Sequence, residues 1–88
     1  MITVIDFYAD WCGPCQAMKP ILEKVVGEMA DKVTLEKVDV DKDQQKASQF
    51  GIMSIPTLVI LKDGKEVDRK MGLQFEPILR QWLESHSR

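Results

Sequence analysis

Residues 9–15 read Ala-Asp-Trp-Cys-Gly-Pro-Cys and contain both cysteines of the chain. Residues 2–9 are almost all apolar and rich in β-branched side chains, which predicts a strand buried on both faces. After the second cysteine, apolar residues recur at the i, i+3, i+4, i+7 spacing of an amphipathic helix. These residues are Met18, Ile21, Leu22, Val25, Val26 and Met29. The two cysteines therefore stand where a buried strand passes into a helix.

Two prolines constrain this helix in different ways. Pro14 is compatible with its first turn, because backbone N–H groups have no helical acceptor there. Pro20 lies inside the helix and removes one internal hydrogen bond, which predicts a kink.

The middle of the chain predicts a strand followed by a short helix. Residues 33–40 are rich in β-branched side chains and favour a second strand. Its apolar positions change parity between Leu35 and Val38, so the assignment of its two faces stays open. Residues 41–50 are polar and predict an exposed helix that ends at Gly51, since glycine suits a left-handed C-terminal position.

The last third predicts a hairpin and a helix. Residues 57–61 form a third strand, and Asp63-Gly64 is a two-residue turn signal that pairs residues 66–71 antiparallel with it. The charges of that fourth strand mark it as an edge of the sheet. A final amphipathic helix follows, whose expected core residues are Phe75, Ile78, Leu79, Trp82 and Leu83.

The element order is therefore β-α-β-α-β-β-α. A parallel βαβ opening followed by an antiparallel hairpin predicts an α/β fold with a mixed four-stranded sheet flanked by helices. At 88 residues, we expect one domain spanning residues 1–88, because two cores would each be too small.

Composition excludes several classes of protein. The formal net charge is −2 and both signs are scattered, so no basic face is available for nucleic acid or for an anionic membrane. The apolar runs are strand-sized, and the N-terminus lacks a signal-type segment. We therefore expect a cytoplasmic protein that binds neither nucleic acid nor membrane.

The chain has two cysteines, and their spacing favours a redox-active pair over a structural disulfide. Closing a loop of four residues restrains the unfolded chain by only ~2 kcal/mol, against ~3 for fifteen residues. Inert thiols and a structural disulfide remain the alternatives. A zinc site is disfavoured because zinc takes four ligands and the single histidine, His86, lies in a polar tail.

The predicted helix start distinguishes the two sulfurs. Unpaired N–H groups and the helix dipole favour a thiolate at Cys12, which predicts that Cys12 is the attacking nucleophile. Cys15 lies one turn later on the same face, and we expect it to be slightly more buried and to resolve the mixed disulfide.

Two segments resemble the thioredoxin family. Residues 10–15 follow a Val-Ile-Asp-Phe-Tyr-Ala strand, and residues 51–57 read Gly-Ile-Met-Ser-Ile-Pro-Thr. Gly64 and Gly72 also fall where thioredoxins keep glycine. The resemblance covers essentially the whole chain and implies a thioredoxin-like fold with protein-disulfide reductase activity, which contributes to cell redox homeostasis.

The resemblance also implies a substrate surface. The Ile55–Pro56 peptide bond is expected to be cis and to face the cysteines, with the Ile55 backbone free to bind an incoming peptide. Trp11, Ile55, Gly72 and Leu73 then form a shallow apolar rim. An ordinary turn proline at Pro56 and a core aromatic at Trp11 are the alternatives.

Asp6 resembles the buried acid that lies beneath the second cysteine in thioredoxins, and Lys37 matches its neighbouring lysine. A carboxylate in an apolar strand loses solvation, so its pKa should be raised toward neutrality. We therefore expect Asp6 to act as general acid and base, helped by Lys37. The alternative is a structural ion pair between the two.

The chain departs from the family pattern in one missing unit and at two positions. Thioredoxins usually have another βα unit before the strand that begins here at Ile2, so either the fold is minimal or the chain is shortened. In both cases residues 33–40 would be an exposed edge, which invites dimerisation of an otherwise monomeric protein. Tyr8 stands where a second Trp is frequent, and Gln16 stands where Lys or Arg is frequent.

The expected activity is a dithiol–disulfide exchange between Cys12 and Cys15, with Gly13 and Pro14 shaping the motif. Protein disulfides are the expected substrates, and electrons are expected from NADPH through a flavoprotein thioredoxin reductase. No bound cofactor and no metal are required. The alternatives are a binding module that uses the apolar rim without turnover, and an oxidase or isomerase of an oxidising compartment.

Overall fold

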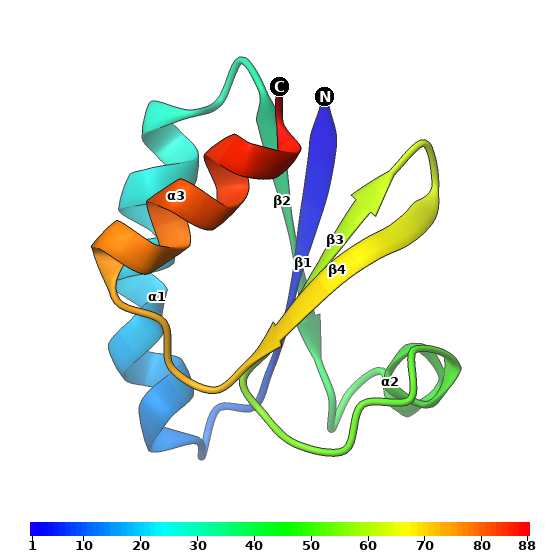
Figure 1. Ribbon diagram of the computed structural model, residues 1–88. Helices are drawn as coiled ribbons and strands as arrows, with labels where there is room; N and C mark the ends of the chain where they lie inside the picture. Colours follow the sequence, from blue (N-terminus) through cyan, green and yellow to red (C-terminus); the bar gives the residue numbers. More distant parts are fainter.

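The computed structural model describes residues 1–88 and follows the predicted order of elements (Figure 1). The strands are β1 (Ile2–Tyr8), β2 (Val33–Asp39), β3 (Thr57–Lys62) and β4 (Lys65–Met71). The helices are α1 (Gly13–Glu28), α2 (Gln44–Gln49) and α3 (Glu76–His86). None of the three helices has the length and apolar character needed to cross a membrane.

The strands form one mixed sheet in the order β2-β1-β3-β4, as predicted. β1 pairs with β2 in parallel and with β3 antiparallel, and β4 pairs antiparallel with β3. In the central strand β1, Asp6 lies between Lys37 of β2 and Leu58 of β3. β2 and β4 are the two edges, so the expectation that residues 33–40 lie at an edge is confirmed.

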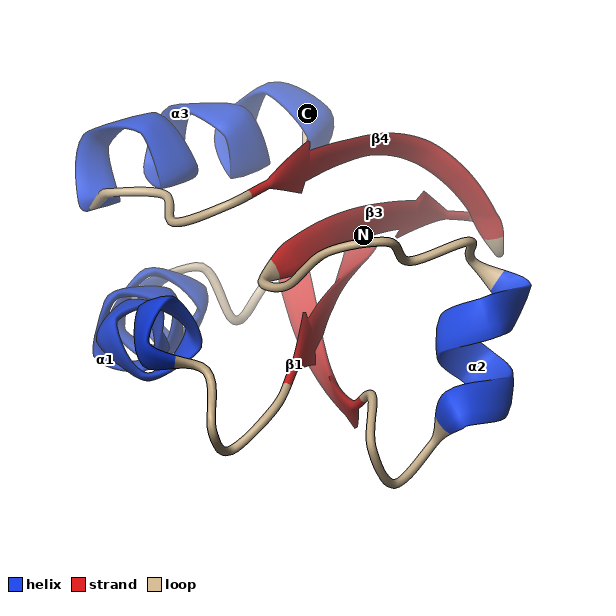
Figure 2. Cartoon of the chain, turned by 90° about the horizontal axis from the view of Figure 1, so that it is seen from below, coloured by secondary structure: helices blue, strands red, loops and turns tan.

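Helices cover both faces of the sheet, and Figure 2 shows α1 and α3 on one side with α2 on the other. Ile2 and Val4 of β1 belong to the core beneath α1 and α3, whereas Ile5 and Phe7 belong to the core on the α2 side. Successive side chains of β1 point to opposite faces of the sheet, so this one strand contributes to both cores.

The change of parity in the second predicted strand has the same cause. Val33 packs in the core beneath α1, while Val38 packs with Phe7 in the core on the α2 side. The first half of β2 therefore buries its apolar side chain on the α1 side of the sheet, and the second half buries its apolar side chain on the α2 side.

The hairpin forms at the predicted turn. Asp63 has a φ of 53° and Gly64 has a φ of 79°, the pair of positive values that a two-residue turn matching the strand twist requires. α1 contains Pro20 and runs from Gly13 to Glu28 as one helix.

α2 is shorter than the predicted helix over residues 41–50. The Asp39 carboxylate accepts hydrogen bonds from the N–H groups of Asp41 at 2.9 Å and Lys42 at 3.3 Å, which folds this segment as a turn. The helix begins only after Asp43, whose side chain accepts from the Lys46 N–H at 3.0 Å.

The prediction for the last helix is partly wrong. Leu79, Trp82 and Leu83 are buried, but Phe75 is 63% exposed and Ile78 is 52% exposed. Phe75 is the extended N-cap residue and lies outside the helical periodicity. Ile78 is 100° around the helix from Leu79, so it lies on the flank rather than on the face that meets α1.

Candidate active site

The cysteine pair occupies the junction between β1 and α1. Cys12 is the N-cap residue of α1, and it is joined to Cys15 by a disulfide with a Cα–Cα distance of 5.2 Å. The Cys12 Sγ atom accepts a hydrogen bond from the Cys15 N–H at 3.2 Å. The sulfur of Cys12 therefore sits at the positive end of the helix, where backbone N–H groups favour a negative charge.

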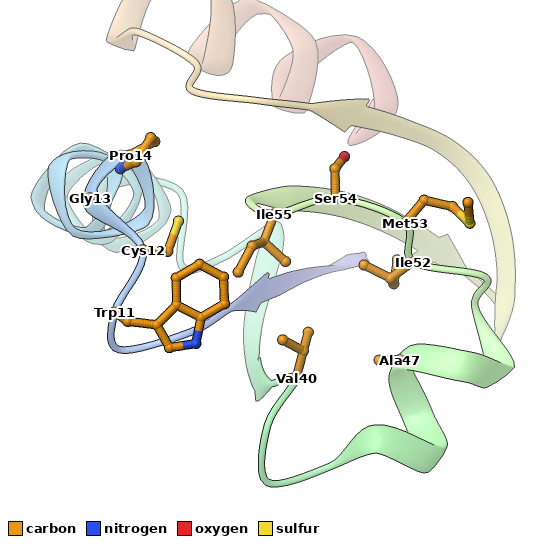
Figure 3. Close-up of a pocket in the computed structure, with 10 residues that line it drawn as sticks. All are labelled: Trp11, Cys12, Gly13, Pro14, Val40, Ala47, Ile52, Met53, Ser54 and Ile55. Carbon is orange, nitrogen blue, oxygen red and sulfur yellow. The ribbon is translucent and has the colours of Figure 1, made fainter.

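An apolar groove of about 510 Å³ opens beside Cys12 (Figure 3). Trp11, Gly13 and Pro14 line it on the α1 side, and Ser54 and Ile55 line it at the loop before β3. Trp11 is 71% exposed, so the alternative that it is a core aromatic is wrong. Its Nε1–H donates to Asp41 Oδ2 at 2.8 Å, which fixes the indole over the groove.

Sequence reasoning missed the far wall of this groove. Val40, Ala47, Ile52 and Met53 line it there, and Figure 3 shows Val40 and Ile52 facing the hollow from the α2 side. The one available signal was that apolar Val40 and Ile52 flank the polar residues 41–50. Their position depends on the parallel pairing of β1 and β2, which brings the C-terminal ends of both strands to the same end of the sheet.

Two residues of the expected rim lie elsewhere. Gly72 and Leu73 do not line the groove. The Gly72 N–H donates to the Pro56 carbonyl at 2.8 Å, and Leu73 packs against the core beneath α1 and α3. Their contribution to substrate binding stays a prediction.

The loop before β3 lies against the cysteines. The Ile55–Pro56 peptide bond is cis, as the resemblance implies, and the Ile55 side chain packs on the small cluster formed by Ala9 and the two cysteines. Thr57 Oγ1 donates to the Ser54 carbonyl at 2.7 Å and closes this loop.

A second, polar pocket of about 80 Å³ opens on the other side of the disulfide. Its lining side chains include three carboxyl or thiol-derived groups and two lysines; the full set is Asp6, Tyr8, Asp10, Cys15, Gln16, Lys19 and Lys37. Cys12 and Cys15 are each 5% exposed, so the expectation that Cys15 is the more buried is wrong. The two sulfurs differ instead in the surface that they reach, because Cys12 borders the apolar groove and Cys15 borders the polar pocket.

Asp6 is buried between β1 and α1, with 4% of its surface exposed. Its Oδ1 atom has no hydrogen-bond partner. Loss of solvation raises the pKa of Asp6 to about 6, and the positive charge of Lys37 offsets part of that rise. The raised pKa predicted from the sequence is therefore confirmed.

The side chains of His, Cys, Asp and Glu do not gather into a group of three that could hold a metal ion. His86 contacts Asp68 instead, with Nε2 at 2.9 Å from Oδ2. The charged side chains that line the pocket beside the disulfide are Asp6, Asp10, Lys19 and Lys37.

A helix-start disulfide beside an apolar groove, with a buried carboxyl group behind it, defines a thiol–disulfide oxidoreductase. The thioredoxin family model matches residues 1–85. The thioredoxin of Bacillus subtilis is 42% identical over 97% of this chain and 82% of its own length. That of Chlamydia muridarum is 44% identical with the same coverage of 97% and 82%.

Solved structures agree with these sequence relatives. The thioredoxin of Fasciola hepatica superimposes with a TM-score of 0.90 at 41% identity, covering 97% of this chain and 80% of its own. The thioredoxin of Malassezia sympodialis gives a TM-score of 0.91 at 40% identity, covering 99% and 76%. The chain belongs to the thioredoxin family, has the thioredoxin fold, and is a thiol–disulfide reductase.

Proposed function

We propose that Cys12 attacks the disulfides of protein substrates and that Cys15 completes the exchange. The observation that carries this assignment is the division of the two sulfurs between two surfaces. Cys12 borders the apolar groove where a polypeptide can lie, and Cys15 borders the polar pocket that contains Asp6.

The exchange transfers two electrons in two steps. In the reduced protein, the Cys12 thiolate attacks one sulfur of the substrate disulfide, and the other substrate sulfur leaves as a thiolate that takes a proton. Cys15 then loses its proton and attacks the Cys12 sulfur. The second substrate thiol is released, and the protein is left with the Cys12–Cys15 disulfide.

Asp6 is the proposed acceptor of the Cys15 proton. Both side chains border the same pocket, and a carboxyl group with a pKa of about 6 is mostly ionised at neutral pH yet still basic enough to take up a proton. Lys37, in register with Asp6 on the neighbouring strand, stabilises the carboxylate before the transfer.

The apolar groove is the proposed substrate surface. Trp11 and Ile55 line the groove next to Cys12, so an apolar side chain next to the substrate cysteine would be covered on binding. The backbone of Ile55, before Pro56, is the proposed hydrogen-bonding partner of the substrate chain. Gly72 and Leu73 would extend this surface beyond the groove.

Each turnover oxidises the protein, so a reductant must restore the dithiol. We propose that NADPH supplies the electrons through a flavoprotein thioredoxin reductase, so that the protein serves electron transport in the cytoplasm without a bound cofactor.

The proposed oligomeric state is a monomer. The unpaired edge of β2 offers a route to a dimer at high concentration.

Two single variants test the assignment. In Cys15→Ser, the mixed disulfide cannot be resolved, so a substrate with a single disulfide should remain covalently attached to Cys12. Cys12→Ser should capture no substrate. If Cys12→Ser captures substrate and Cys15→Ser does not, the two roles are reversed.

The double variant Cys12→Ser, Cys15→Ser separates catalysis from binding. It should lose disulfide reduction completely while keeping its fold by circular dichroism. A binding module would keep its biological effect in this variant, whereas a reductase would lose it.

A further inference from the structure

Three side chains, Asp6, Tyr8 and Lys37, lie on one face of the sheet behind the disulfide. Asp6 and Tyr8 are two residues apart on β1 and so point to the same face, and Lys37 lies beside Asp6 on β2. The Lys37 Nζ atom stands 4.9 Å from the centroid of the Tyr8 ring. This distance is that of a cation–π interaction.

The Tyr8 ring is the contact that holds the end of Lys37. Lys37 is an exposed residue, and the ion pairs of the structure do not include it. A lysine of this kind carries about 2 kcal/mol of rotamer entropy and would otherwise spread over many positions in water. The aromatic face confines its ammonium group near the pocket that contains Asp6.

We propose that Tyr8 is a positioning residue, whose ring keeps the Lys37 ammonium group beside the Asp6 carboxylate during proton exchange with Cys15. This inference rests on the proposed proton-accepting role of Asp6. Lys37 makes no direct ion pair with Asp6, so it acts on the carboxylate through its charge. An interaction through space depends on where that charge is held, which makes its anchor important.

Other charged groups also face the pocket and must be controlled for. They are Asp10 from the loop after β1 and Lys19 from α1, whereas Cys15 does not titrate while it is in the disulfide. Gln16 Nε2 donates to the Asp10 carbonyl at 3.1 Å and holds that loop against α1. Tyr8 is the only aromatic residue among the lining side chains.

The direct test is the titration of the Asp6 carboxyl carbon by NMR in the oxidised protein. Replacing the ring in Tyr8→Leu should raise the midpoint by about half a pH unit, which corresponds to about 0.7 kcal/mol of weakened attraction between the released Lys37 charge and the carboxylate. Tyr8→Phe and Tyr8→Trp keep an aromatic face, so their midpoints should stay near that of the unaltered protein.

A double-mutant cycle separates this effect from altered burial. In Lys37→Met the charge is absent, so adding Tyr8→Leu should produce no further shift. A Tyr8→Leu shift of the same size in both backgrounds would mean that the ring acts by desolvation, and no shift in either would mean that it does not hold Lys37. Both outcomes overturn the proposal.

A kinetic readout distinguishes this proposal from the one on which it rests. The rate of mixed-disulfide resolution should rise with pH as Asp6 ionises, and Tyr8→Leu should move that midpoint upward by the shift seen in the titration. If Asp6→Asn keeps the same pH dependence, the proton role of Asp6 fails. The NMR cycle would still decide whether Tyr8 positions Lys37.

Discussion

Removing the buried carboxyl group should stabilise the oxidised protein at neutral pH. Asp6 is 4% exposed and its Oδ1 atom has no hydrogen-bond partner, so ionisation is disfavoured in the folded state. In the unfolded chain the same group is hydrated and ionises freely. The substitution Asp6→Asn removes the charge and keeps the shape of the side chain.

The size of the effect follows from the shift in pKa. Folding moves the pKa of Asp6 from 3.8 to about 6. A difference of about two units corresponds to about 3 kcal/mol at 1.36 kcal/mol per unit. Between these two pKa values the folded state binds more protons than the unfolded state, so the free energy of unfolding falls as pH rises through this window. Above it, the loss is complete.

Urea unfolding of the oxidised protein from pH 4 to pH 8 measures this loss. The free energy of unfolding of Asp6→Asn should exceed that of the unaltered protein by up to about 3 kcal/mol at pH 8 and by much less at pH 4. In thermal unfolding the difference corresponds to roughly 12–24 °C for a domain of this size. The amide of Asn still lacks partners, which makes 3 kcal/mol an upper bound.

A matched control isolates burial from the mere loss of a charge. Asp31 is exposed in the turn between α1 and β2, so Asp31→Asn should leave both the stability and its pH dependence unchanged. Parallel pH curves for the unaltered protein and Asp6→Asn would refute the reasoning, because the carboxyl group would then have the same pKa in both states.

Three further predictions concern the groove, the last helix and the hairpin. Ala47→Glu places a charge on the apolar wall of the groove, so KM for a protein disulfide should rise about threefold to tenfold, while KM for a small disulfide stays unchanged. Trp82→Phe loses the 2.8 Å hydrogen bond from Nε1–H to Asp68, which should lower the free energy of unfolding in urea by about 1–2 kcal/mol. Gly64→Ala should lower the free energy of unfolding by about 1–2 kcal/mol in the same assay, because φ at this position is 79°, which disfavours alanine. The added methyl group would contact nothing within 4 Å, so no new packing would offset this backbone strain.

The order of elements could be predicted because its signals are local. The buried strand before Cys12, the amphipathic repeat after Cys15 and the Asp63-Gly64 turn each specify their own structure within a few residues. The helix-start position of the cysteines follows from the same local pattern. So does the raised pKa of Asp6, since an acid inside an apolar strand is buried whatever covers it.

The errors come from contacts between distant residues. Periodicity placed Ile78 in the core, but the width of the face that meets α1 decides which flank of a helix is covered. Composition made residues 41–50 helical throughout, but the Asp39 carboxylate captures the first N–H groups as a turn. The far wall of the groove was missed, because Val40 and Ile52 line it only after β1 and β2 pair.

The two sulfurs border different surfaces because of where β1 and β2 end. β1 and β2 run in parallel, so Trp11 and Val40 both follow the strands at the same end of the sheet. The Val40 N–H donates to the Tyr8 carbonyl at 2.9 Å there. The groove therefore forms on the α2 side of this end, and Asp6 points to the α1 side. A helix that starts between them must present its N-cap sulfur to the groove. The sulfur one turn later borders the pocket that contains the carboxyl group, so the proposed attack and the proposed proton transfer would occupy opposite sides of one disulfide.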